Sequence, residues 1–542
     1  MKSVTFEKER LAGPGGLIAE LLDGDVAARA LFPPWSFTAA LPGAAYPSPR
    51  PSPLEPDHLV TSDSDTSRRL ARVLEGGGHV VTTGQQPQLF GGPLYVLYKA
   101  LSAARLAGRI EAQTGQPGVA VFWVAGDDHD WAEVASVGFL DTDESYGRID
   151  VQPPPELAGS SVGPSPLGDG IGQTVQDFLG GVTAGEADAR WAELLQREYQ
   201  PDRTFSQAFI GVLSEMTRGL PIAFLDATHP GVRRASISLI QEVLEDRQGV
   251  DEALRAGTEA VRGLGYRPQL GYVEGAIPVF REAGQGRHRL RGTSGAIQVA
   301  PDGTSLQVEE VVLELSGGGH FSPSAALRPV LESWLLPVSA TVLGPGEMAY
   351  WAQLGPLFER LRVPMPVVEA RDSWRIVERR VARLLEKTGV SAGILGGGLE
   401  EATAGLIERS RPRSVEEALL RLEEHADRGL SEMDGIVSRD LPGLRPAVGK
   451  GRAQVFAALA SVRKAMDRMT RDRERAAIAQ LERASTHLYP GGVPQERAIA
   501  IWAFLSRYGD DFLDAALKAS ATPIRGDGSS PGCGVAGESA GD

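Results

Sequence analysis

The sequence has a single cysteine, Cys533, among its 542 residues. One cysteine cannot form an intrachain disulfide or supply a cysteine-rich zinc site. Cys533 also lies in the stretch SSPGCGVAGESAGD, which is typical of a disordered tail and not of the electropositive pocket that a catalytic thiol requires. We therefore expect neither disulfides nor cysteine catalysis. No resident metal centre is predicted either, because the histidines show no metal-ligand spacing with each other.

Long hydrophobic runs and an excess of positive charge are also missing. No apolar run approaches the roughly 20 residues that span a bilayer, and the opening residues MKSVTFEKER contain no hydrophobic signal core. The formal net charge is −15, whereas proteins that bind phosphate backbones depend on clustered Lys and Arg. The sequence thus predicts a cytoplasmic protein that binds neither membranes nor nucleic acids.

Strands and helices alternate between residues 76 and 370, which predicts an α/β domain built on a parallel sheet. The strand candidates HVVTTG, GVAVFWVAG, LPIAFLDA and SATVL are each short, apolar and rich in β-branched residues. Segments of about 151–200 and 265–320 interrupt the pattern as insertions, and the second alternates polar and apolar residues like a β-hairpin. Residues 1–75, which contain Pro-rich connectors, are expected to wrap this core.

Residues 371–485 are charged and rich in alanine and leucine, which favours long helices. Ser414-Val-Glu-Glu417 has the form of a helix-capping box. Further along, Leu459, Val462, Met466 and Met469 recur in steps of three and four. We expect a coiled-coil domain of antiparallel helices, with an ordinary helical bundle as the alternative because Arg473 breaks the seam.

The C-terminal part returns to mixed turns and amphipathic helix. Residues 486–520 are expected to fold back on the core, where Gln495, Glu496 and Arg497 would either close a site or dock the segment. Residues 521–542 are small and polar, which predicts a flexible tail.

Polar residues and glycines follow the first candidate strand, where open α/β sheets bind ligands. The candidates at this strand end and at the start of the next helix are Thr83, Gly84, Gln85, Gln86, Gly91 and Gly92. Free amides at a helix start suit a phosphate or a carboxylate. The spacing matches neither a P-loop nor GxGxxG, so a tight turn without a ligand is the alternative. Lys99, further into this helix, is expected to be solvated or ion-paired.

Four titratable side chains follow the second candidate strand, namely Asp127, Asp128, His129 and Asp130. We predict that His129 is a general base that takes a proton from an attacking amine. Asp127 or Asp128 would bind a substrate amino group or Mg²⁺, and Asp130 is a further ligand-binding candidate. The alternative is that one aspartate caps a helix while the others are solvated.

A third group of candidates surrounds the last candidate strand. Arg328 has a planar guanidinium that suits a carboxylate or a phosphate, and a buried salt bridge is the alternative. Gly344 and Glu347 belong to the turn after the strand. Trp351 and Gln353 lie on the helix that follows, where core packing is the alternative.

Four blocks of this sequence resemble, in this order, the signature blocks of the BshC family: TGQQPQLFGGPLYVLYKA, FWVAGDDHDWAEV, FSPSAALRPVLESWLLPVSATVLGPGEMAYWAQL and YPGGVPQER. The resemblance runs from about residue 79 to 515. It implies a Rossmann-like core with connecting insertions, an α-helical coiled-coil domain and a homodimer. It also implies a ligase of bacillithiol biosynthesis that joins cysteine to glucosaminyl-malate in the last step.

Amide formation from a free carboxylate requires activation, and adenylation or phosphorylation by ATP with Mg²⁺ would supply it. We therefore expect ATP (or ADP) as a co-substrate and no organic prosthetic group. HIGH and KMSKS signatures are missing, so the nucleotide position stays open between the strand-end crevice and the junction with the helical arm. Two other functions stay open: a non-catalytic nucleotide- or metabolite-binding scaffold, and a nucleotidyltransferase acting on a sugar phosphate.

Overall fold

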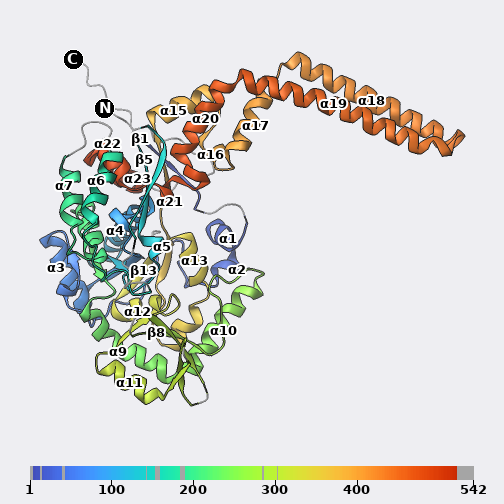
Figure 1. The fold of residues 1–542 in the computed structure, drawn as a ribbon. Helices are drawn as coiled ribbons and strands as arrows, with labels where there is room; N and C mark the ends of the chain where they lie inside the picture. The colour runs from blue at the N-terminus through green and yellow to red at the C-terminus, as the bar shows by residue number, and fades with distance from the viewer. Residues whose placement is uncertain are drawn as a thin grey trace. The chain divides into compact units, whose positions relative to one another are not determined.

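The chain divides into two compact units in the computed structural model (Figure 1). One unit contains Phe6–Arg375 and the described residues from Glu496 onward, and the other is formed mainly by Ile376–Gln495. The predicted tail, apart from its first residue, and Cys533 lie outside the described residues. The structure describes residues 4–11, 15–38, 43–141, 143–152, 159–182, 189–283, 286–293, 295–301 and 303–521.

A six-stranded sheet forms the centre of the first unit, in the order β14-β13-β3-β4-β7-β2. All neighbouring pairs are parallel except β2 with β7 at one edge. The four strands predicted from the sequence are adjacent in this sheet, so the predicted Rossmann-like parallel core is confirmed. The strands are β2 (Val60–Thr61), β3 (His79–Gln85), β4 (Gly118–Val124), β7 (Ile222–Asp226), β13 (Val338–Leu343) and β14 (Val367–Ala370).

The two faces of this sheet pack against different helices. Val80 and Val121 belong to the large core that includes helices α9, α10, α12 and α13. Phe122 points to the other face, where its ring lies 5.9 Å from that of Phe209 in α8. Apolar residues on both faces explain why these strands read as continuous hydrophobic runs. Among the helices that contact the sheet or its core are α4 (Leu94–Thr114), α8 (Phe205–Met216), α9 (Pro230–Glu245), α10 (Arg247–Gly263), α12 (Arg328–Leu335) and α13 (Pro345–Trp351).

The strand order reverses at β3, which lies between β4 and β13. From β3 the chain first builds β4 and β7 on one side of the sheet, and it later adds β13 and β14 on the other side. The carboxyl ends of these strands share one edge of the sheet because the strands are parallel. Such a reversal leaves a crevice between neighbouring loops, which is where open α/β sheets bind ligands.

A second sheet contains five antiparallel strands in the order β11-β10-β9-β8-β12. The β8–β9 pairing confirms the predicted hairpin, whereas the short strands β10, β11 and β12 were not predicted. Ile277, Leu290 and Ile297 place one face of this sheet in the large core. The bounds are β8 (Ala276–Glu282), β9 (Arg287–Gly292), β10 (Ile297–Val299), β11 (Thr304–Leu306) and β12 (His320–Pro323).

The other elements of the first unit surround these two sheets, and β5 pairs with β6 in an antiparallel ladder. The remaining helices and strands that lie wholly in this unit are α1 (Leu17–Asp23), α2 (Val26–Arg29), α3 (Ser64–Arg72), α5 (Trp131–Val134), β5 (Ser136–Leu140), β6 (Tyr146–Asp150), α6 (Ile171–Val182), α7 (Ala189–Glu198), α11 (Val308–Ser316), α14 (Gly355–Arg360), α22 (Trp502–Tyr508) and α23 (Asp510–Ala521). Across the described part of the chain, no helix is long and apolar enough to cross a membrane.

The second unit contains a hairpin of two long antiparallel helices, α18 and α19, joined by a turn at Pro442–Leu444 (Figure 1). Arg463 of α19 forms ion pairs with Glu416 and Glu423 of α18, which fix the two helices side by side. The predicted coiled-coil domain is confirmed. Its helices are α15 (Arg379–Thr388), α16 (Ala392–Leu395), α17 (Leu399–Ser410), α18 (Arg413–Asp440), α19 (Arg445–Arg473) and α20 (Arg475–Leu488).

Two details of the predicted coiled coil were wrong. Ser414 does not cap a helix, because α18 already begins at Arg413 after Pro412. Leu459 and Met466 are buried as expected, but Val462 and Met469 are 52% and 72% exposed. The seam continues instead through Arg463 and Thr470. Hydrophobicity alone suggested the wrong residues because an ion-paired arginine occupies one seam position.

The side chain of one glutamine, Gln495, joins the two ends of the segment Ile376–Gln495. The Gln495 side chain accepts a hydrogen bond from the Ile376 backbone nitrogen at 2.8 Å and donates to the Ile376 carbonyl oxygen at 3.1 Å. Gln495 also donates to the His487 carbonyl oxygen at 2.8 Å. The first and last residues of the long helical segment therefore lie side by side.

Candidate functional site

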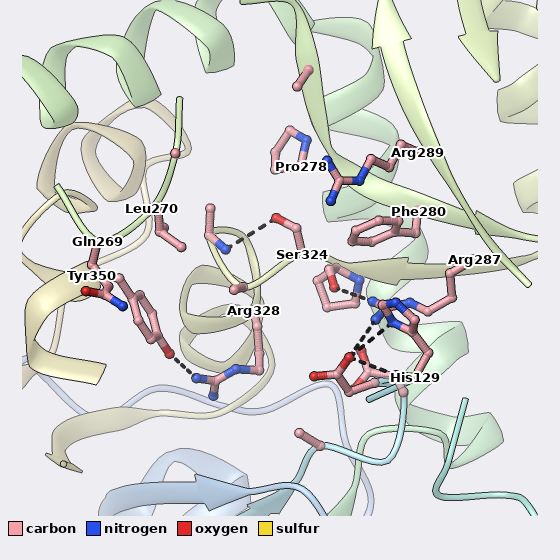
Figure 2. Close-up of a pocket in the computed structure, with 18 of the residues that line it drawn as sticks. His129, Gln269, Leu270, Pro278, Phe280, Arg287, Arg289, Ser324, Arg328 and Tyr350 are labelled. Carbon is pink, nitrogen blue, oxygen red and sulfur yellow. Dashed lines mark hydrogen bonds and ion pairs between the residues drawn. The ribbon is translucent and has the colours of Figure 1, made fainter. Parts of the chain in front are cut away.

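A cavity of about 1100 Å³ opens at the carboxyl ends of β3, β4 and β13. Its wall includes Gln85 at the end of β3, Asp127 after β4 and Gly344 after β13. The β8–β9 hairpin contributes the facing wall, including Phe280 and Arg289 (Figure 2). The cavity therefore occupies the crevice that the reversal of strand order creates, and its size suits small-molecule substrates.

Asp127 is a buried carboxyl group on this wall. Desolvation raises its pKa to about 6, although the positive charge of Arg287 opposes that shift. The same loop folds back on residues 161–163, where the Ser161 hydroxyl donates to the Asp127 carbonyl oxygen at 3.1 Å. A carboxyl group with this pKa changes its charge near neutral pH, which is common among residues that handle protons or ammonium groups.

Asp128 connects the ends of β3 and β4 and orients His129. Its carboxylate accepts a hydrogen bond from the Gln86 side chain at 2.9 Å and lies 3.3 Å from Nδ1 of His129. The same carboxylate is 3.3 Å from the Arg287 guanidinium. The His129 ring is 51% exposed, and no described residue forms a hydrogen bond with its Nε2. The geometry holds the ring by one nitrogen and leaves the other for a ligand.

Lys99 is buried on the opposite side of β3 from this loop. Its Nζ lies 2.6 Å from the Glu347 carboxylate and donates to the Gly84 carbonyl oxygen at 2.7 Å. Burial lowers the pKa of Lys99, and the Glu347 carboxylate opposes this shift. The expected ion pair exists, but Lys99 is not solvated. A lone lysine within the mostly apolar stretch Leu94–Leu101 was the signal for a buried charge.

Arg328 lines the cavity and also forms the buried salt bridge that was its structural alternative. Its guanidinium lies 3.1 Å from the Glu332 carboxylate and contacts the Tyr350 hydroxyl (Figure 2). These acidic and phenolic partners keep the pKa of Arg328 above its ordinary value despite desolvation. The two readings of Arg328 are compatible because its fork has more donors than Glu332 and Tyr350 use.

The structure places ten predicted site residues together on the cavity wall. Gln353 is one of them, but its amide accepts from the Leu270 nitrogen at 2.8 Å and donates to the Leu270 carbonyl oxygen at 3.1 Å. It therefore holds the loop at Leu270, which also lines the cavity. The ten residues are Gly84, Gln85, Gln86, Asp127, Asp128, His129, Arg328, Gly344, Glu347 and Gln353.

Three predicted ligand-binding residues near β3 lie away from this cavity. The Thr83 hydroxyl donates to the Val342 carbonyl oxygen at 2.9 Å and so joins β3 to β13. Gly91 and Gly92 have φ of +81° and +78°, which favours glycine, and they form the turn before α4. The first amide of that helix donates to the Ile499 carbonyl oxygen at 3.0 Å. These glycines shape the chain, which corrects their prediction as binding residues.

Asp130 and Trp351 are two further corrections. Asp130 is the cap of α5, and its carboxylate accepts the Glu133 backbone N–H at 3.3 Å. Trp351 is buried, with its ring 5.8 Å from that of Phe358. In both cases the structural alternative describes the residue, because short-range capping and core packing already use the side chain.

Sequence reasoning missed several charged residues of the cavity wall. Glu133 follows the acidic loop, and burial raises its pKa. The motif RHRLRG carried the signal for three others, since alternate residues of a strand share a face. Among the described residues, no group of three or more His, Cys, Asp or Glu could hold a metal ion. The missed residues are Lys99, Glu133, Arg287, Arg289, Arg291 and Arg371, whereas Arg497, which was predicted to close a site or dock the segment, also lines the cavity.

Comparison with known families covers both units. Residues 57–372 match the family model for the N-terminal Rossmann-like domain of BshC of bacillithiol biosynthesis, and residues 375–523 match its C-terminal coiled-coil domain. The chain belongs to the BshC family. The resemblance seen in the four sequence blocks is thereby confirmed.

Curated members of the BshC family match most of this chain. A relative from Heliobacterium modesticaldum is 30% identical over 84% of this chain and 83% of its own length. Relatives from Salinibacter ruber and Geobacillus thermodenitrificans are each 28% identical, over 83% and 86% of this chain and 82% and 86% of their own lengths. All three are named "putative cysteine ligase BshC".

The raised pKa of Asp127 predicts a pH-dependent stability difference. An unfolded aspartate ionises near pH 3.8 and the folded one near 6, so the folded state binds more protons in between. The contribution of Asp127 to the free energy of unfolding therefore falls as pH rises from about 4 to 6, by up to about 3 kcal/mol. Asp127→Asn is expected to gain stability over wild type across this window, as urea unfolding at several pH values would measure. A constant difference from pH 4 to 8 would contradict this, and Asp130→Asn is the control.

Proposed function

We propose that this cavity is the active site of an ATP-driven ligase that forms an amide bond between cysteine and glucosaminyl-malate. The observation that carries the proposal is the His129–Asp128 pair beside the buried Asp127, all on one wall of the strand-end cavity. The names of the family relatives support cysteine as the substrate. The descriptions of the two matching family models support a place in bacillithiol biosynthesis.

The reaction needs one activation and one acyl transfer. ATP converts the cysteine carboxylate into an acyl adenylate or an acyl phosphate, and pyrophosphate or ADP is released. The glucosaminyl amine then attacks the activated carbonyl carbon, the new C–N bond forms, and AMP or phosphate leaves. The attacking nitrogen loses one proton. His129 is positioned to accept that proton through Nε2, while Asp128 stabilises the imidazolium that results.

Charged groups of the cavity divide the remaining tasks. The carboxylates of Asp127 and Glu133 suit the ammonium group of cysteine. Arg328 and Lys99 also line the cavity, and their positive charge would stabilise negative charge that develops during acyl transfer. As the alternative to ammonium binding, Asp127 or Asp128 could supply the hard oxygen ligands that Mg²⁺ prefers, and Mg²⁺ bound with ATP would neutralise phosphate charge.

An endpoint assay by mass spectrometry tests the proposed reaction. The purified full chain is incubated with ATP, Mg²⁺, cysteine and glucosaminyl-malate, and each component is omitted in turn. We expect a product with the summed mass of both substrates less one water, and its loss when ATP or cysteine is absent. AMP among the products identifies adenylation, and ADP identifies an acyl phosphate. Nucleotide binding without product favours the scaffold, and pyrophosphate release without cysteine favours the nucleotidyltransferase.

The cellular and oligomeric predictions accompany this proposal. ATP and reduced cysteine are both available in the cytoplasm, which is where we place the reaction. The homodimer implied by the family resemblance is tested by light scattering during gel filtration of the full chain. A mass equal to one chain across the working concentrations would contradict it.

A further inference from the structure

Three arginines occupy alternate positions on β9, namely Arg287, Arg289 and Arg291. Alternate residues of a strand share a face, and Leu290 on the opposite face is buried in the large core. The arginine face is therefore directed away from the core. All three arginines line the cavity, and Figure 2 shows the side chains of Arg287 and Arg289 around Phe280.

Arg287 is fully engaged by protein groups. Its guanidinium pairs with Asp128 at 3.3 Å, donates to the Pro323 carbonyl oxygen at 3.0 Å and to the Ser322 hydroxyl at 3.1 Å, and lies 4.3 Å from the centre of the Phe280 ring. Its side chain is only 6% exposed. Arg287 thus supports the acidic loop and has little capacity left for a ligand.

Arg289 and Arg291 differ from Arg287 in their exposure and in their lack of partners among the described residues. Both are exposed to the cavity, and within the part of the chain that the structure describes neither has an ion pair or a side-chain hydrogen bond. The other cationic side chains of the wall have acidic partners, except Arg497, which lies over the Tyr95 ring. The positive charge that acidic side chains leave uncompensated is therefore concentrated on β9.

Two unpaired guanidinium groups on one strand face favour a ligand with two negative charges. Residues two apart on a strand are separated by about 7 Å, so both forks can reach neighbouring anionic groups. The like charges repel each other, and an anion between them removes that repulsion. The chain as a whole carries a net charge of −15, so this patch is not a consequence of a basic composition.

We propose that Arg289 and Arg291 form an anion subsite that binds the multiply charged end of a substrate, with each fork bound to its own carboxylate or phosphate group. The proposal rests on the proposed function, in which the dicarboxylate of the malyl group and the phosphates of the nucleotide share this chemistry. Arg287 lies between this subsite and the Asp128–His129 pair, both along β9 and through its contact with Asp128. A substrate held by its anionic end at Arg289 would extend toward His129.

Equilibrium binding by calorimetry at low salt tests this subsite in the full chain. The probes are glucosaminyl-malate and ADP, and the variant is Arg289→Gln with Arg291→Gln. We expect the Kd for one probe to rise about tenfold or more while the Kd for the other changes little, which identifies the anionic group that is bound. The matched control is Arg68→Gln with Arg72→Gln on α3, which removes the same charge outside the cavity.

The outcomes separate the subsite from the proposed function. If the ligase assay works, the double variant is expected to raise one KM by about the factor by which the Kd rises, with kcat nearly unchanged. This is the KM for glucosaminyl-malate if that probe loses affinity, and the KM for ATP if ADP does. If the wild-type protein makes no amide but the double variant still loses anion binding, the subsite proposal stands and the ligase proposal is wrong. Equal Kd values for wild type and variant with both probes, or no binding of either probe by wild type, would overturn the subsite. Unchanged thermal unfolding shows that the variant is folded.

Discussion

Replacing His129 with alanine is expected to lower the rate of amide formation by about 100-fold or more while ATP binding stays near the wild-type level. The imidazole is held by Asp128 through Nδ1, and its Nε2 is the group proposed to accept the proton of the attacking amine. Without it, the proton must leave to water, which is a weaker base. Single-turnover product formation measured by mass spectrometry checks the rate, and calorimetry with ATP checks binding.

Chemical rescue separates proton transfer from a structural role of His129. Added imidazole is expected to restore part of the rate in His129→Ala, because the ring leaves a partly exposed site that a small base can enter. His425→Ala is the matched control, since His425 is an exposed histidine of α18 outside the cavity. If His129→Ala kept wild-type activity while removal of α18 and α19 abolished thiol production in cells, the scaffold function would replace the ligase.

Glu496→Ala is expected to destabilise the first unit by about 3 to 5 kcal/mol. The Glu496 carboxylate forms two hydrogen bonds with the Arg371 guanidinium, at 2.6 and 2.9 Å, and accepts the Ser373 hydroxyl at 2.8 Å. Their side chains are only 2% exposed for Arg371 and 6% for Glu496. Removal of the acid leaves a buried positive charge without its partner. Denaturant unfolding followed by tryptophan fluorescence measures the loss.

Two further variants show whether the buried charge causes this loss. Replacing both partners, with Arg371→Met and Glu496→Leu, is expected to recover most of the stability because no uncompensated charge remains. Glu424→Ala, at an exposed position of α18, is expected to stay within about 0.5 kcal/mol of wild type. If Glu496→Ala were as mild as Glu424→Ala, the pair would not be what docks the C-terminal segment.

The core strands and the acidic loop could be predicted because their signals are local. An apolar run such as Gly118–Val124 must be buried, and the abrupt change to Asp127 and His129 marks the strand end. Chain reversal around β3 then brings such ends together. The structure joins Gln86 and Asp128, which are candidates from two different strand ends, by a hydrogen bond.

The parts that could not be predicted depend on tertiary packing. The pattern RHRLRG shows that three arginines share a face, but only the packing of the second sheet directs that face toward the cavity. Gly91 and Gly92 looked like ligand loops because glycine serves both ligand approach and positive φ. Trp351 had no local feature that separates a core residue from a stacking platform. In each case the role of the residue depends on neighbours that are distant in sequence.

The hydrogen bonds between Gln495 and Ile376 have a consequence for evolution and engineering. The chain enters the helical unit at Ile376 and leaves it at Gln495, and these two residues are adjacent in space. The unit therefore has the geometry of a domain inserted into the sequence of the first unit. Its length can change by whole heptads without stretching the chain on either side, because the entry and exit points stay fixed. The same closure suggests a deletion design, in which a few flexible residues replace the module between Ile376 and Gln495.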